Sequence, residues 1–123
     1  VNPLGKMPAL FIHDPPAVTT KVIFESRVIA DYIIDRFADV QPPFVASSPE
    51  RRAVGSLVAA ICDNYIAHLQ PYMYKPFDAD VDRAAKIQEM GTAFDAIENV
   101  LDSNGPYVSG SDISVGDAAL LGK

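Results

Sequence analysis

The pair Glu25-Ser26 stands where a short apolar run, residues 22–24, gives way to a helical pattern. The first turn of a helix leaves backbone N–H groups unpaired, and the helix dipole adds partial positive charge there. A serine hydroxyl at this place can join those N–H groups in binding a carboxylate, and an adjacent glutamate can bind the ammonium group of the same ligand. The pair therefore suits the head of a free amino acid or of a γ-glutamyl group.

The same pair is also typical of helices that bind nothing. Serine is a favoured N-cap, and glutamate is favoured near a helix start for stability alone. Residue types at this junction leave both interpretations open, so the surrounding sequence has to decide between them.

A second motif precedes the pair by about fifteen residues. Residues 2–10, NPLGKMPAL, contain the turn signals Asn-Pro and Leu-Gly, and then Met-Pro leads into an apolar run. Residues 2–12 together with 22–37 resemble the glutathione transferase family. Its members carry an Asn-Pro-x-Gly-x-x-Pro loop, a β-hairpin, and Phe/Tyr-Glu-Ser-Arg at the start of a helix. The phi and delta classes and the gamma subunit of translation elongation factor one look closest.

The resemblance implies a glutathione site. In the family, the proline that matches Pro8 follows a cis peptide bond, and the backbone of the residue matching Met7 pairs with the cysteinyl unit as an added strand would. Lys6 would lie near the glycyl carboxylate; a solvated loop lysine is an equally good interpretation. The implied glutathione-binding residues are Lys6, Met7, Pro8, Glu25, Ser26 and Arg27.

The resemblance also implies the fold class. We expect an α/β thioredoxin-like domain, with residues 1–38 as its second half (a β-hairpin plus helix), followed by an all-α helical domain. Residues 39–47, with a Pro-Pro pair and no periodicity, are the expected linker. Phe44 in it either locks into a partner subunit or packs between the domains. Residues 48–123 would hold only the first helices of the second domain, and the chain is expected to be an internal fragment.

The apolar spacing predicts the individual elements. Strands are expected at residues 9–12 and 21–24, although the connection HDPPAVTT is longer than a tight turn and leaves the hairpin register in doubt. A helix is expected over residues 26–37. A long helix begins after the cap Ser48 and should kink or end near residues 67–70, because Pro71 lies inside its pattern. Its expected apolar face is Val54, Leu57, Val58, Ile61, Tyr65, Leu69, Tyr72 and Met73.

Two further helices are expected near the carboxyl end. The first is capped by Asp80 or Asp82, and its helical pattern is broken by residues 104–106, Asn-Gly-Pro. Its expected apolar positions are Ile87, Met90, Phe94, Ile97 and Leu101. The second begins at Ser114, which with Asp117 has the spacing of a capping box. Glutathione transferases carry a similar box at the central helix of their helical domain, so the implied role of this pair is structural.

The remaining candidates have weaker signals. Cys62 lacks local positive charge, which favours an inert helical thiol, and the isolated His13 and His68 favour surface or cap roles. One cysteine and two distant histidines give no metal-ligand spacing. Asp63 is a minor candidate for a dimer interface. Tyrosines on the long helix either line a hydrophobic-substrate pocket or belong to the core: Tyr65, Tyr72 and Tyr74.

Composition excludes several classes of function. The chain of 123 residues has 16 acidic and 10 basic residues and a net charge of −6, which disfavours a nucleic-acid partner. No apolar run reaches the length of about 18 residues that a membrane span needs. No targeting segment is visible, and a cytoplasmic location is expected.

The implied function is conjugation of the glutathione thiolate to hydrophobic electrophiles, by a homodimer, with glutathione as co-substrate and no cofactor. The residue that activates the thiolate in the family lies in a segment that would precede Val1. No catalytic residue is therefore assigned, and these 123 residues alone are expected to be inactive. The alternative is a non-catalytic assembly module, like the elongation-factor gamma subunit or a stress-related protein.

Overall fold

A computed structural model describes residues 2–13, 20–40, 48–74 and 82–122. The chain divides into two compact units, Val1–Pro42 and Pro43–Lys123. The boundary falls within the linker expected at residues 39–47, most of which, with Phe44, lies outside the described residues. Among the described helices, none is long and apolar enough to cross a bilayer.

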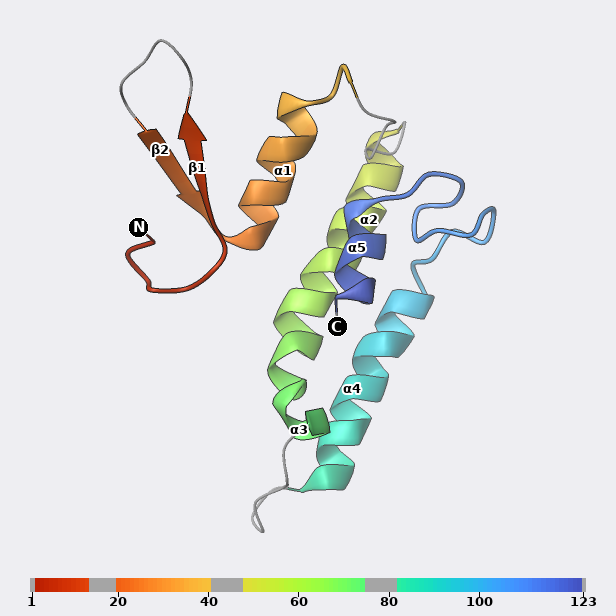
Figure 1. Cartoon of the computed structure of the whole chain (residues 1–123). Coiled ribbons are helices and arrows are strands. Elements are labelled where there is room, and N and C mark those ends of the chain that lie inside the picture. Colours follow the sequence, from red (N-terminus) through yellow and green to blue (C-terminus); the bar gives the residue numbers. More distant parts are fainter. Residues whose placement is uncertain (1, 14–19, 41–47, 75–81, 123) are drawn as a thin grey trace. The chain divides into compact units, whose positions relative to one another are not determined.

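Unit 1 is a β-hairpin followed by a helix (Figure 1). Strands β1 (Ala9–His13) and β2 (Thr20–Phe24) pair antiparallel, with Ala9 opposite Phe24 and an unbroken register to the other end. This regular ladder removes the doubt about register, although residues 14–19 lie outside the described part. Helix α1 (Ser26–Arg36) follows β2 directly and ends one residue earlier than predicted.

The described part of unit 1 has no buried hydrophobic side chain. Phe11, Val28 and Phe37 are each about half exposed. The one buried residue described there is polar, Asn2, at 6% exposure. Hydrogen bonds, including those of the strand ladder, therefore stabilise the described part of this unit more than the burial of apolar side chains does.

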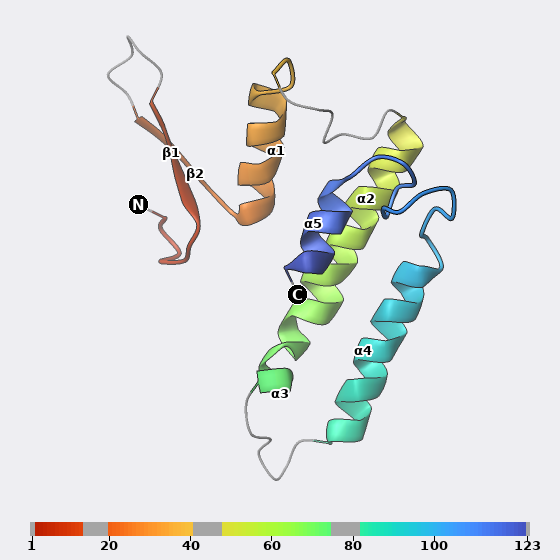
Figure 2. The same ribbon diagram turned by 45° about the vertical axis from the view of Figure 1, so that its right-hand side comes forward.

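Unit 2 is built around helices α2 (Pro49–Ile61), α4 (Arg83–Glu98) and α5 (Val115–Leu121), which lie side by side in both ribbon views (Figures 1 and 2). Ser48 caps α2, because its hydroxyl accepts a hydrogen bond from the Arg51 N–H at 3.2 Å. Asp82 caps α4 in the same way, which decides between the two predicted caps. The core contains Val58, Ile61, Cys62, Ile66, Ala93, Ile97 and Val108.

The long helix departs from the predicted geometry. After α2 the chain forms a π-helical turn η1 (Cys62–Ile66), a 3₁₀ turn η2 (Ala67–Leu69) and a short helix α3 (Pro71–Tyr74). The predicted irregularity near residues 67–70 is present, but α-geometry already ends at Ile61. A π turn closes an i to i+5 hydrogen bond instead of i to i+4, so the residues after it rotate relative to α2.

This rotation corrects the predicted apolar face. Ile66, five residues after Ile61, is buried at 2% exposure, whereas Tyr65 is 61% exposed. Leu57 and Met73 were also assigned to that face, and both are about half exposed. Helical spacing misplaced Tyr65 and Met73 because it assumed one continuous α-helix. Leu57 lies within α2, before the π turn, so its exposure does not come from this rotation.

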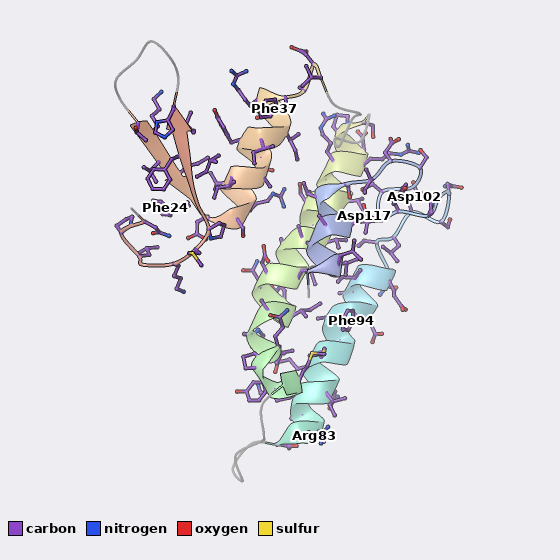
Figure 3. The ribbon with its side chains drawn as sticks, viewed as in Figure 1. Phe24, Phe37, Arg83, Phe94, Asp102 and Asp117 are labelled. Carbon is purple, nitrogen blue, oxygen red and sulfur yellow. The ribbon has the colours of Figure 1, made fainter. Side chains whose placement is uncertain are left out.

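Helix α4 buries a narrower face than predicted. Ala93 and Ile97 are buried, but Ile87 and Phe94 are 61% and 42% exposed. Leu101, predicted on the same face and 43% exposed, lies beyond the end of α4 at Glu98. Phe94 is labelled on α4 in Figure 3. Amphipathic spacing identified the helix correctly, but it does not say how much of an apolar stripe a neighbour covers.

Candidate functional site

The hairpin brings the two sequence motifs to the same place. Because Ala9 pairs with Phe24, the residue before Ala9 and the residue after Phe24 leave the hairpin at the same end (Figure 1). Opposite residues of an antiparallel pair have Cα atoms about 4.5–5.5 Å apart. The Met-Pro loop and the start of α1 are therefore neighbours in space.

Residues 2–6 form a closed turn before this end of the hairpin. The Asn2 Oδ1 accepts a hydrogen bond from the Leu4 N–H at 2.8 Å, and its Nδ2 donates to the Lys6 carbonyl at 2.7 Å. The Gly5 N–H donates to the Asn2 carbonyl at 3.0 Å, and Gly5 has a φ of +64°, which glycine adopts readily.

The predicted cis peptide bond between Met7 and Pro8 is confirmed. Met7 is 93% exposed, and its own peptide N–H and C=O have no hydrogen-bond partner among the described residues. Lys6 is exposed as well. This end of the loop thus offers backbone donors and acceptors to solvent.

The start of α1 is open. Glu25 occupies the N-cap position without a side-chain cap bond, and the first helical hydrogen bond runs from the Ile29 N–H to the Glu25 carbonyl at 3.0 Å. Ser26 is the first helical residue, so the interpretation of Ser26 as a plain N-cap is wrong. No acidic side chain lies in the first turn. The exposed Ser26 hydroxyl therefore stands at the positive end of the helix dipole.

Glu25 has an unusual backbone that the sequence does not reveal. Its φ of 73° lies in a region that residues with a Cβ rarely adopt. Such a conformation costs on the order of 1–3 kcal/mol and is concentrated at ligand sites. Its side chain is exposed, and its carboxylate has no hydrogen bond or ion pair with the described residues.

The positive φ of Glu25 predicts that glycine and alanine at this position differ in stability. We expect Glu25→Gly to be more stable than Glu25→Ala by about 1 kcal/mol, because both lose the carboxylate but only glycine accepts the positive φ without strain. Chemical denaturation followed by far-UV circular dichroism measures the difference. Equal stabilities of the two variants would show that the positive φ stores no strain.

Arg27 has a neighbour on its own helix. Its Nε donates to both carboxylate oxygens of Asp31, at 3.1 and 3.2 Å, across one helical turn. The Arg27 side chain is about one-third exposed. Its charge stays near the start of α1, but Asp31 partly neutralises it.

The three tyrosine candidates of unit 2 differ in whether they line a groove. Tyr72 lines a groove of about 110 Å³, and the Lys86 ammonium lies 5.7 Å from the centre of its ring. Tyr65 does not line this groove, and the Tyr74 side chain lies outside the described part. The residues lining the groove are Leu69, Tyr72, Met73, Arg83, Lys86, Ile87 and Met90.

Beside the groove, His68 is not isolated. Its Nε2 lies 2.7 Å from Glu89, whose other oxygen accepts from Lys86 at 2.8 Å. These hydrogen bonds, that of Lys86 first and then that of His68, lower the pKa of Glu89. His13 lies 3.1 Å from the Thr20 hydroxyl across the hairpin.

The single cysteine offers no exposed thiol. Cys62 is fully buried in the core of unit 2, and Asp63 next to it is exposed. No group of three or more potential metal ligands occurs in the described residues.

The predicted capping box of Ser114 and Asp117 is present and connects parts of unit 2. Asp117 accepts hydrogen bonds from the Ser114 N–H at 2.7 Å and the Ser114 hydroxyl at 2.8 Å, and its other oxygen accepts from the Val108 N–H at 2.8 Å. Asp117 is labelled on α5 in Figure 3. The carboxylate thus joins the helix start to the loop before it, a contact that the capping-box spacing does not reveal.

Comparison with known proteins supports the assignment of unit 1. Residues 1–35 match the family model described as Glutathione S-transferase, N-terminal domain. The chain carries a glutathione S-transferase-like segment. The match covers the loop, the hairpin and most of α1, and therefore every residue of the candidate site. It implies a thioredoxin-like fold, with which the observed hairpin, helix and mostly helical remainder agree. No curated protein matches the chain.

Proposed function

We propose that the Met-Pro loop and the start of α1 bind glutathione, in a protein that conjugates the glutathione thiolate to hydrophobic electrophiles. The observation that carries the proposal is the hairpin register, which brings exposed Met7 and the open first turn at Ser26 to the same end of the hairpin. The family match over residues 1–35 supports the same ligand.

The charges suit the γ-glutamyl end of glutathione. Its α-carboxylate would accept hydrogen bonds from the Ser26 hydroxyl and from N–H groups of the first turn, at the positive end of the dipole. Its ammonium would pair with Glu25, which has no competing partner among the described residues. Arg27 would add positive charge, although it shares that charge with Asp31.

The loop suits the rest of the tripeptide. The Met7 N–H and C=O would pair with the cysteinyl unit, as an extended peptide adds to a strand edge. Lys6 would contribute its ammonium to the glycyl carboxylate as a point charge. Pro8 would fix the chain after Met7.

Transferase chemistry needs a group that lowers the pKa of the glutathione thiol, such as a hydroxyl or thiol donor. We assign no residue of this chain to that role: Cys62 is buried in unit 2, and the Ser26 hydroxyl is assigned to the γ-glutamyl carboxylate. The 123 residues are therefore expected to show no turnover alone. The proposal includes a cytoplasmic homodimer and a hydrophobic-substrate pocket, for which Tyr72 is the better placed candidate and exposed Tyr65 the weaker one.

Replacing Ser26 with alanine tests the ligand assignment. We expect Ser26→Ala to weaken glutathione binding by about 1.5–3 kcal/mol, or roughly 10- to 150-fold, because a charge-assisted hydrogen bond to the carboxylate is lost. Isothermal titration calorimetry on the full chain measures this affinity.

The control for this test is Ser103→Ala, since Ser103 is an exposed loop residue of unit 2, and its affinity should equal that of the wild type. An unchanged affinity in Ser26→Ala would remove Ser26 from the site. Turnover of an electrophile by these 123 residues would contradict the expectation that they are inactive alone.

A further inference from the structure

Asn2 combines burial with two directed hydrogen bonds. It is 6% exposed, its Oδ1 accepts from the Leu4 N–H, and its Nδ2 donates to the Lys6 carbonyl. Because one partner is a donor and the other an acceptor, only one orientation of the side-chain amide satisfies both. Asn2 therefore holds the Lys6 carbonyl in a defined direction.

The direction of the Lys6 carbonyl sets that of a second group. The carbonyl of Lys6 and the N–H of Met7 belong to the same peptide unit, which is planar and trans. In a trans peptide the N–H points opposite to the C=O. When Asn2 holds the carbonyl, the Met7 N–H points away from Asn2, on the side where no described residue accepts a hydrogen bond from it.

We propose that Asn2 is a positioning residue that aims the Met7 N–H at the cysteinyl carbonyl of the bound peptide. This inference rests on the proposed function, because it assigns a task to a residue that does not itself touch glutathione. The site then distinguishes ligands by their chemistry. Asn2 raises the affinity for a γ-glutamyl compound that has a carbonyl at the cysteinyl position, and leaves unchanged the affinity for one that lacks it.

Two ligands separate this task from general support of the fold. Glutathione carries the cysteinyl carbonyl, whereas γ-glutamylethylamide carries the same γ-glutamyl head without it. Asn2→Asp retains the acceptor for Leu4 but places a carboxylate oxygen against the Lys6 carbonyl. We expect this variant of the full chain to bind glutathione about tenfold more weakly, and γ-glutamylethylamide within twofold of the wild type. Titration followed by NMR chemical shifts measures both affinities.

Asn2→Ala is the neutral second variant and should show the same selective loss. An equal loss for both ligands would assign Asn2 a merely structural role and overturn the proposal. A loss in Asn2→Asp but not in Asn2→Ala would assign the effect to charge, and unchanged affinities would also overturn it. If the wild type binds neither ligand, the proposed function itself fails; if it binds both and the Asn2 variants match it, only the positioning role fails.

Discussion

Asp117→Ala is expected to lower the free energy of unfolding of unit 2 by roughly 2–6 kcal/mol. The Asp117 carboxylate accepts from the backbone N–H groups of Ser114 and Val108, and both residues are less than 5% exposed. Without the carboxylate both donors lose their partner where water has little access, and each unsatisfied group costs about 1–3 kcal/mol. Urea denaturation of the full chain, followed by circular dichroism, measures the loss.

Three comparisons make this prediction specific. Ser114→Ala removes only the cap hydroxyl and should lose about 0.5–2 kcal/mol. Asp117→Asn keeps one acceptor oxygen but turns an NH₂ group toward the remaining donors, so it should fall between wild type and Asp117→Ala. Asp95→Ala, at an exposed position of α4, should stay within about 0.5 kcal/mol of wild type. If Asp117→Ala is no worse than Ser114→Ala, the bond to Val108 adds nothing to stability.

Gly116→Ala is expected to destabilise unit 2 by about 1–3 kcal/mol. Helices α2 and α5 approach so closely that a Cβ at Gly116 would lie 2.9 Å from the Gly55 carbonyl oxygen and 3.0 Å from a Val108 methyl. The first of these neighbours is backbone, which cannot rotate away as a side chain can. The added methyl therefore pushes the two helices apart.

Gly91→Ala is the matched control because nothing lies within 4 Å of a Cβ built at Gly91 in α4. There the same change should stabilise the protein by about 0.5–1 kcal/mol, since alanine is the better helix former. If the close contact between α2 and α5 is the reason for glycine at position 116, thermal unfolding should give a lower melting temperature for Gly116→Ala and a higher one for Gly91→Ala. Stabilisation in both would mean that α2 and α5 separate at no cost.

These two stability predictions concern unit 2, and the proposed glutathione site lies in unit 1. Variants at Asp117 and Gly116 leave every candidate glutathione residue chemically unchanged. Their glutathione affinity, measured where the protein is folded, should equal that of the wild type. The Ser26 and Asn2 variants should behave in the opposite way, with affinity changed more than stability.

Local features of the chain could be predicted from the sequence by itself. The strands, α1 and the cap Ser48 follow from residues within a few positions of one another, and the cap of α4 was limited to Asp80 or Asp82, because hydrogen bonds at helix ends act over that range. The cis bond before Pro8 was implied by the family motif, not by composition. The residue types of the candidate site were visible too, because Glu-Ser and Met-Pro each occupy consecutive positions.

Only the tertiary structure decided how distant residues meet. The hairpin register, which joins Met7 to the Glu25-Ser26 junction, depends on pairing across residues 13–20, where the sequence offered no clear turn type. The positive φ of Glu25 is imposed by the passage from β2 into α1, because glutamate has no intrinsic preference for it.

In unit 2, the π turn at Cys62–Ile66 replaces Tyr65 with Ile66 in the core. The Gly55 and Gly116 backbones are brought together by packing across about sixty residues of chain. Periodicity predicts which side chains favour burial. Which element covers them depends on the close packing of whole helices and strands, because the fit of each surface depends on all the others.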